Sequence, residues 1–131
     1  MPEGHVIHRL ANGLTDLFGG HVVRVSSPQG RFADEAALLD GSVLSGAQAY
    51  GKHLFVDFGP TRVVHIHLGL IGKLWLIDGA PTSPAGPETV RLRIARDELS
   101  AELRGPQWCR LVTDEVRDEV IATSGDDPIR P

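Results

Sequence analysis

Apolar side chains recur every three or four residues at the start of the chain and alternate with polar ones over much of the remainder. The first pattern predicts a helix over residues 4–18, which Gly19 and Gly20 end. Alternating runs bounded by glycine and proline are typical of strands. We expect strands over residues 21–26, 42–50, 52–58, 62–68, 72–77, 89–96, 99–104 and 109–112.

Two shorter helices complete the predicted elements. One covers residues 33–39, and the other covers residues 113–121 with Thr113 as its N-cap and acidic residues in its first turn. Residues 78–87 hold several glycines and prolines and are expected to form a loop. The fold class is therefore mainly β with flanking helices, an antiparallel β-sandwich of seven to eight strands.

Composition places the chain among globular domains. It has 131 residues, of which 41% are hydrophobic and 23% charged. The single cysteine, Cys109, excludes an internal disulfide framework and a cysteine-rich zinc site, and we expect a buried structural thiol. No apolar run is long enough for a membrane span, and the first residues lack the cationic start of a signal peptide. We expect a protein of an intracellular, reducing compartment.

The charge balance at first argues against a nucleic-acid partner, because the formal net charge is −4. The acidity, however, lies towards the end of the chain. Residues 1–96 carry nine basic and eight acidic side chains, whereas residues 97–131 carry four and nine. We interpret the acidic stretch as a solvated helix face.

The first candidate for chemistry is the start of the chain, Met1, Pro2 and Glu3. Removal of Met1 would leave Pro2 with a free secondary amine, which can attack an aldehyde carbon and form an iminium. Glu3 could then supply or remove a proton. The alternative is that proline and glutamate are ordinary residues for the first turn of a helix.

The second candidate is Lys52, which lies between two predicted strands after Gly51 and before His53. A lysine in a tight turn projects a mobile cation from a rigid hairpin, which suits binding of a phosphate. The alternative is that it only makes the turn soluble.

The third candidate is the segment from His65 to Lys73. His65 and His67 would share one face of a strand, which is a spacing that metal ligands use, although nothing nearby completes a metal shell. Leu70 and Ile71 lie between two glycines, where they could insert between bases or fold back into the core. Trp108 could belong to the core or form a stacking surface.

Together these motifs resemble the N-terminal domain of the formamidopyrimidine-DNA glycosylase and endonuclease VIII family. The resemblance rests on three segments in the family's order, covering most of residues 1–112. They are Pro2-Glu3-Gly4, Gly51-Lys52-His53-Leu54 and His67-Leu68-Gly69-Leu70-Ile71-Gly72. The start and the segment from Arg104 to Cys109 favour the endonuclease VIII-like branch, whose members are similar to enzymes that remove oxidised pyrimidines and cut abasic sites.

The resemblance implies a DNA glycosylase with abasic-site lyase activity, acting on damaged DNA in base excision repair. Pro2 would be the Schiff-base nucleophile at C1′, Glu3 the proton donor that opens the sugar, and Lys52 the hairpin lysine. Four residues would contact DNA: His67 beside the backbone, Leu70 with Ile71 in the space left by the flipped base, and Lys73.

The resemblance also sets expectations for the rest of the protein. Residues 1–122 would form the catalytic domain and residues 123–131 the start of a linker to a helix–two-turn–helix domain and a zinc finger. We expect no cofactor or metal in this chain itself, and the resemblance implies a cytoplasmic, nucleoid-associated monomer. The chain departs from the oxidised-purine branch at Val6 and over residues 105–110. The alternative function is a DNA-binding or interaction module of the same fold without catalysis.

Overall fold

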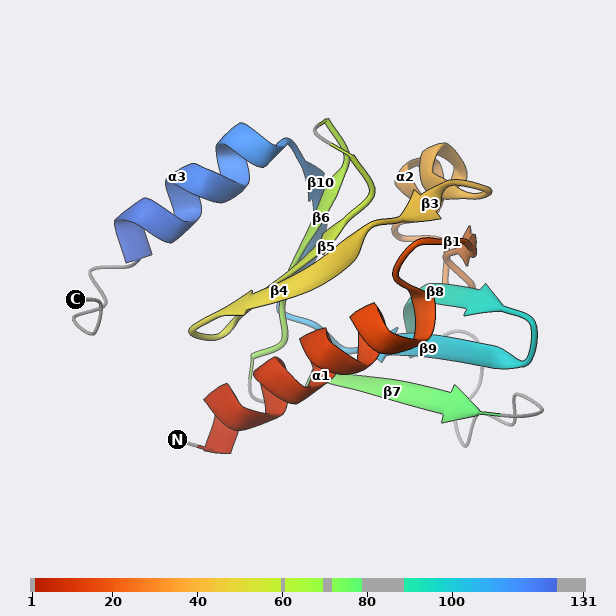
Figure 1. Ribbon diagram of the computed structural model, residues 1–131, viewed down its shortest axis with the longest axis horizontal. Helices are drawn as coiled ribbons and strands as arrows, with labels where there is room; N and C mark the ends of the chain where they lie inside the picture. Colours follow the sequence, from red (N-terminus) through yellow and green to blue (C-terminus); the bar gives the residue numbers. More distant parts are fainter. Residues whose placement is uncertain (1, 60, 70–71, 79–88, 125–131) are drawn as a thin grey trace.

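The computed structural model describes residues 2–59, 61–69, 72–78 and 89–124, with side chains described for 7–59, 61–69, 72–77 and 89–122. These ranges contain three helices (Figure 1). They are α1 (Pro2–Phe18), α2 (Ala33–Leu39) and α3 (Asp114–Ser124). All three lie where the sequence pattern predicts helices, with ends that differ by up to three residues.

Two four-stranded antiparallel sheets form the body of the domain. The first sheet has the order β10-β6-β5-β4, from β4 (Gly46–Tyr50), β5 (His53–Asp57), β6 (Val63–His67) and β10 (Trp108–Val112). The second has the order β2-β8-β9-β7, from β2 (Arg24–Ser26), β7 (Lys73–Asp78), β8 (Val90–Arg96) and β9 (Leu99–Arg104). The predicted antiparallel β architecture is confirmed.

Two of the predicted strands are each divided into two. Residues 21–26 form β1 (His21–Val22) and β2, and residues 42–50 form β3 (Val43–Leu44) and β4. β1 and β3 pair with each other in a two-stranded ribbon, after which β2 and β4 enter different sheets. The alternating pattern continues through both divisions because inward side chains such as Val23 and Leu44 stay buried.

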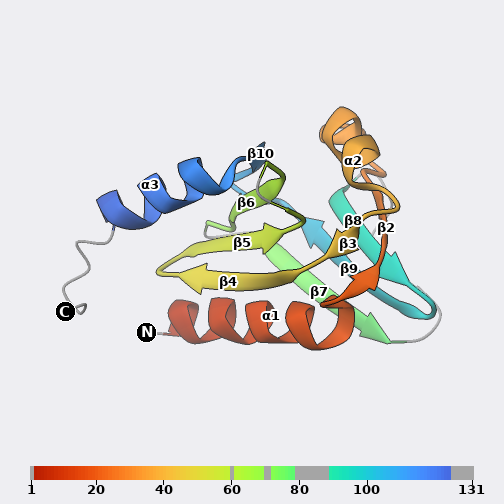
Figure 2. The ribbon, with the colours of Figure 1, turned by 45° about the horizontal axis from the view of Figure 1, so that its top comes forward.

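The inner faces of the two sheets share one hydrophobic core with α1. That helix contributes Ile7, Ala11, Leu14 and Phe18 to it. α1 lies along β4 and also contacts β5 and β7 (Figure 2). The hydroxyl of Thr15 fixes the position, because it accepts the Ala47 N–H at 3.0 Å and donates to the Ala11 carbonyl at 3.0 Å. The last turns of α1 are thereby held against the first sheet.

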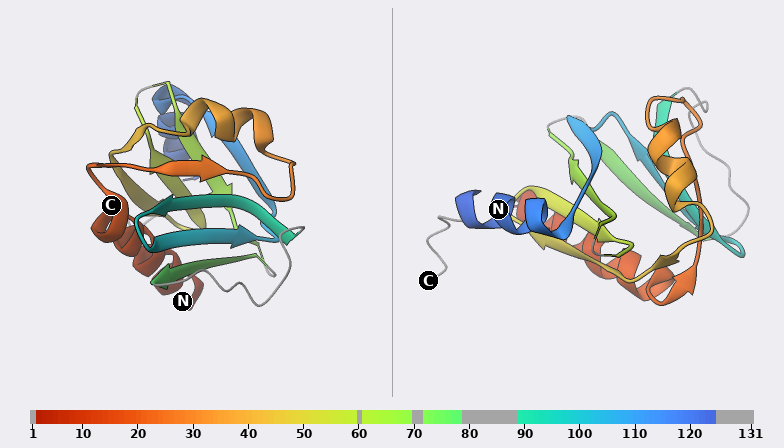
Figure 3. Two further views of the ribbon diagram at one scale, coloured as in Figure 1. Left: turned by 90° about the vertical axis from the view of Figure 1, so that its right-hand side faces the viewer. Right: turned by 90° about the horizontal axis from the view of Figure 1, so that it is seen from above.

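The other helices lie at the margins of the sandwich. α2 packs beside β2, at the edge of the second sheet opposite α1 (Figure 3). α3 projects from the end of β10, and Thr113 caps it as predicted, because its hydroxyl accepts the Val116 N–H at 3.2 Å. Arg117 ties α3 to β5 through Asp57 at 3.3 Å. In the part of the chain that is described, no helix is long and apolar enough to cross a membrane.

Candidate functional site

Three structural features meet at one end of the sandwich. They are the start of α1, the tip of the β4–β5 hairpin and the end of β6 (Figures 1 and 2). Each comes from a different one of the three predicted candidate segments. Antiparallel pairing explains part of this arrangement. It places the end of β4, the start of β5 and the end of β6 at the same end of the first sheet.

The hairpin tip consists of two residues, Gly51 and Lys52, between the paired Tyr50 and His53. Gly51 has a φ of +57°, a conformation that favours glycine at the first position of a two-residue hairpin turn. Lys52 is exposed at this tip. The predicted placement of a lysine on a tight turn is confirmed, and its role stays a prediction.

Beyond the hairpin, aromatic rings gather on the outer face of the first sheet. The register places His53 and Trp108 on either side of His67. The His67 ring stacks on Trp108 with centroids 4.7 Å apart, and the Arg110 guanidinium lies 4.8 Å from the Trp108 centroid. Trp108 is half-buried, so this side chain belongs to a stacked surface cluster and not to the main core.

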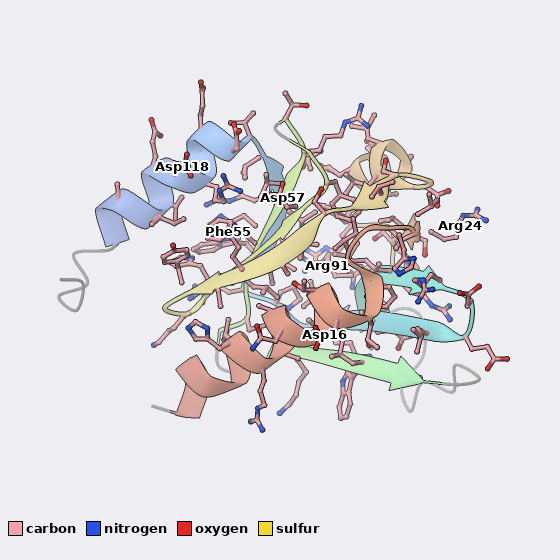
Figure 4. All side chains as sticks on the ribbon, in the orientation of Figure 1. Asp16, Arg24, Phe55, Asp57, Arg91 and Asp118 are labelled. Carbon is pink, nitrogen blue, oxygen red and sulfur yellow. The ribbon has the colours of Figure 1, made fainter. Side chains whose placement is uncertain are left out.

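His65 lies beneath this cluster and is fully buried. It stacks on Phe55 with centroids 4.7 Å apart, and its Nε2 lies 2.9 Å from Nδ1 of His53. Figure 4 shows Phe55 and Asp57 on the side of β5 towards α3. The side chains of His65 and His67 do share one face, as predicted, although His65 bonds to another histidine.

The electrostatic setting keeps the two bonded histidines neutral. Burial first, and then the nearby charges of His53, Arg110 and His67, together lower the pKa of His65 to about 4. The pKa of His53 is also lowered, first by burial and then by His67 and Arg110. At neutral pH the contact is therefore a hydrogen bond between two uncharged rings. Among the described residues no group of three or more potential ligands could hold a metal ion.

The connection from β6 to β7 is closely fitted at both of its glycines. Gly69 has a φ of +73°, and a Cβ there would lie 3.1 Å from the Gln107 Oε1. The Gly72 N–H donates to the Leu68 carbonyl at 3.1 Å, and a Cβ on Gly72 would lie 2.2 Å from that oxygen. This contact holds Gly72 against Leu68.

The remaining predicted site residues have different outcomes. Lys73 is exposed at the start of β7, opposite Arg104 of β9. Leu70 and Ile71 lie outside the described residues. α1 begins at Pro2, but the side chains of Pro2 and Glu3 also lie outside the described part, so their roles stay predictions.

Sequence reasoning missed the link between His53 and His65. A signal for it was present, because predicted strands 52–58 and 62–68 are joined by a short glycine–proline segment. An antiparallel pair joined in this way brings the ends of the two strands together. Cys109, expected to be buried, is partly buried and packs against the core, and this burial raises its pKa to about 12.

Comparisons with known proteins agree on one family. Residues 1–107 match the family described as Formamidopyrimidine-DNA glycosylase N-terminal domain. The chain is 48% identical over 134 residues to Endonuclease 8 1 of Mycobacterium bovis, covering 99% of this chain and 49% of that protein. It is 29% identical over 136 residues to a formamidopyrimidine-DNA glycosylase of Geotalea uraniireducens, covering 99% of this chain and 46% of that protein. The chain thus spans about half the length of these curated relatives.

Solved structures share the fold at low sequence identity. A structure of MutM in complex with DNA containing carbocyclic 8-oxo-G superposes with a TM-score of 0.71 and 15% identity, over 94% of this chain and 47% of that one. Formamidopyrimidine-DNA glycosylase of Lactococcus lactis, bound non-covalently to DNA with an abasic site, superposes with a TM-score of 0.70 and 16% identity, over 94% and 48%. These likenesses establish the fold.

Proposed function

The chain belongs to the family of formamidopyrimidine-DNA glycosylase N-terminal domains, and from this premise we propose that it is the catalytic part of a DNA glycosylase and abasic-site lyase. Its substrate would be DNA carrying oxidised bases, with oxidised pyrimidines preferred. The similarity to Endonuclease 8 1 supports this choice of branch. The observation that carries the proposal is the meeting of the α1 start, the Lys52 hairpin and the His67 strand end at one end of the sandwich (Figure 2).

In the proposed reaction the nitrogen of Pro2 attacks C1′ of the damaged nucleotide. The C1′–base bond breaks, the base leaves with the bonding electrons and a proton, and Glu3 protonates the ring oxygen so that the sugar opens. Pro2 then forms an iminium with C1′, whose positive charge makes loss of a C2′ proton and elimination of the 3′ phosphate easier. This chemistry requires removal of Met1, because an acylated nitrogen does not attack C1′.

The remaining residues would hold the DNA. Lys52 would contact a phosphate and assist elimination from the hairpin tip, and His67 and Lys73 would lie along the backbone. Leu70 and Ile71 would occupy the space that the flipped base leaves. Exposure of Lys52 and Lys73, the only lysines in the chain, supports their use as phosphate contacts.

Borohydride trapping tests the proposal. The full-length protein that carries this sequence is incubated with abasic-site duplex and sodium borohydride, which reduces an iminium to a stable covalent adduct. We expect an adduct with the wild type, none with Pro2→Gly, and an unchanged yield with His21→Gln, a control on the distant β1–β3 ribbon. A folded wild-type protein that binds the duplex and yields no adduct would support the non-catalytic module instead.

A further inference from the structure

The hydrogen bond between His53 and His65 requires one ring to donate and the other to accept. The atoms are His53 Nδ1 and His65 Nε2, 2.9 Å apart, and the rings are inclined at 43°. The register pairs His53 with His67 and His65 with Phe55, so the bond runs diagonally between neighbouring strands. It therefore fixes one ring relative to the other independently of the backbone ladder.

The surroundings of His65 assign the direction of this bond. Its other ring nitrogen, Nδ1, is buried and has no hydrogen-bond partner among the described residues. A hydrogen on Nδ1 would be a buried unpaired donor, and orphaned buried N–H groups are rarer in proteins than under-satisfied acceptors. The hydrogen is thus assigned to Nε2 of His65, which donates to Nδ1 of His53. Neutral His53 then carries its own hydrogen on Nε2.

The hydrogen on His53 Nε2 is available to a ligand. His53 is half-buried, and its hydrogen bond among the described residues is made at Nδ1, with His65. The same reasoning applies to His67, whose Nδ1 is buried and unpartnered. The two rings are 5.3 Å apart, and Lys52 directly precedes His53. Two imidazole side chains and one lysine therefore share this end of the sheet.

We propose that His53 is a further phosphate contact of this protein, donating from Nε2 to the DNA backbone, and that buried His65 is a positioning residue that holds the His53 ring in the required tautomer. This inference rests on the proposed function for its ligand. Phosphate oxygens accept hydrogen bonds from neutral as well as charged side chains, and such contacts fix the register of the duplex. The side chains near the His53 ring come from two neighbouring strands and from β10. They are Tyr50 of β4, His65 and His67 of β6, and Trp108 and Arg110 of β10.

Two substitutions at His53 separate a phosphate contact from a structural role. Gln places an amide N–H near the position of Nε2, whereas Asn places its amide oxygen near Nδ1, where it can still accept from His65. For a duplex with an uncleavable abasic analogue, we expect His53→Asn to raise Kd by about five- to tenfold, the effect of losing one hydrogen bond. His53→Gln should recover most of that affinity. A purely structural role predicts the opposite order.

Substitutions at His65 test the positioning role. His65→Leu removes the donor to His53 and should raise Kd by about threefold or more, within the range of one weakened hydrogen bond. His65→Gln restores an N–H near Nε2 and should rescue binding. Thermal melts of each variant report folding, and His21→Gln serves as the histidine control, since it is exposed on β1.

Salt dependence provides a readout that distinguishes a neutral donor from a cation. Loss of Lys52 in Lys52→Gln should lower the slope of log Kd against log salt by about one. His53→Asn should leave that slope as in the wild type. Equal Kd values for wild type, His53→Asn and His53→Gln would overturn the inference, as would a slope change in His53→Asn equal to that of Lys52→Gln.

The inference and the proposed function fail in different ways. A wild-type protein that neither binds the duplex nor forms a borohydride adduct contradicts the proposed function. A wild type that binds and forms the adduct, with His53 variants of unchanged affinity, contradicts only the inference about His53.

Discussion

Acidification should destabilise this domain through His65, because the folded protein holds that ring uncharged and the unfolded chain does not. The ring is fully buried and bonded to His53, and Arg110, His53 and His67 all disfavour a positive charge on it. Its pKa falls from an ordinary value of 6.5 to about 4 in the folded state. Between these two values the unfolded chain binds the proton and the folded protein does not.

The sign and size of the effect follow from linkage. A histidine with a lowered folded-state pKa contributes stability that is fully present above pH 6.5 and is lost as the pH falls towards 4. With these values the free energy of unfolding should be lower by about 2 kcal/mol at pH 5 than at pH 8, and by about 3 kcal/mol once the pH is below 4. His53 adds to the loss in the same direction, because its pKa is lowered as well.

The assay is urea denaturation of the wild type, His65→Gln and His21→Gln at several pH values between 8 and 4.5. His65→Gln should be less stable than the wild type at pH 8 and yet show a flatter dependence of the free energy of unfolding on pH. His21→Gln should follow the wild type. If His65→Gln loses as much stability between pH 8 and pH 5 as the wild type does, His65 is not the group responsible and the assigned neutral pair is wrong.

Two further predictions concern other parts of the fold. Gly72→Ala should lower the free energy of unfolding by about 2 kcal/mol or more, because its Cβ would lie 2.2 Å from the Leu68 carbonyl oxygen. The control Gly46→Ala should fold normally, since its Cβ would lie 3.8 Å from Thr15. Equal urea midpoints for the two variants would show that the contact with the Leu68 carbonyl can be relieved at little cost. Glu102→Gln should cost about 3 kcal/mol, because its buried carboxylate lies 2.9 Å from Arg104 and 3.7 Å from Arg93. Arg24→Gln breaks an exposed pair and should change the thermal midpoint little, so a comparable drop in both variants would contradict the role of burial.

Most of the fold could be predicted from the sequence. Alternate side chains of the strands are buried, and the sequence therefore alternates between apolar and polar residues there. The hairpin around Lys52 and the N-cap at Thr113 are local features, and both follow from a few neighbouring residues. The division of residues 42–50 into β3 and β4 could not be predicted, because alternation continues across it. The strand divides where its pairing partner changes, because β3 pairs with β1 and β4 pairs with β5.

Single residues of the candidate site could be predicted from the sequence, but contacts between residues of different strands could not. Lys52 lies on the tip of the β4–β5 hairpin, His67 at the end of β6 and Lys73 at the start of β7. Whether Trp108 is a core or a surface residue depends on the neighbour of β10, and that neighbour is β6, some forty residues earlier in the chain. The His53–His65 bond likewise depends on the diagonal relation of two strands, which the spacing of the histidines alone does not define.

The late position of β10 has a consequence for synthesis of the protein. β6 pairs with β5 on one side and with β10 on the other. Until residue 112 has left the ribosome, β6 remains an edge strand with unpaired backbone groups. Four of its five residues have side chains that are buried in the complete fold. Such an edge can pair with other chains and initiate aggregation. A nascent or prematurely terminated chain that lacks Trp108–Val112 would therefore be open to such pairing. The strand that supplies Trp108 to the stacked rings also covers the edge of β6 once it has been made.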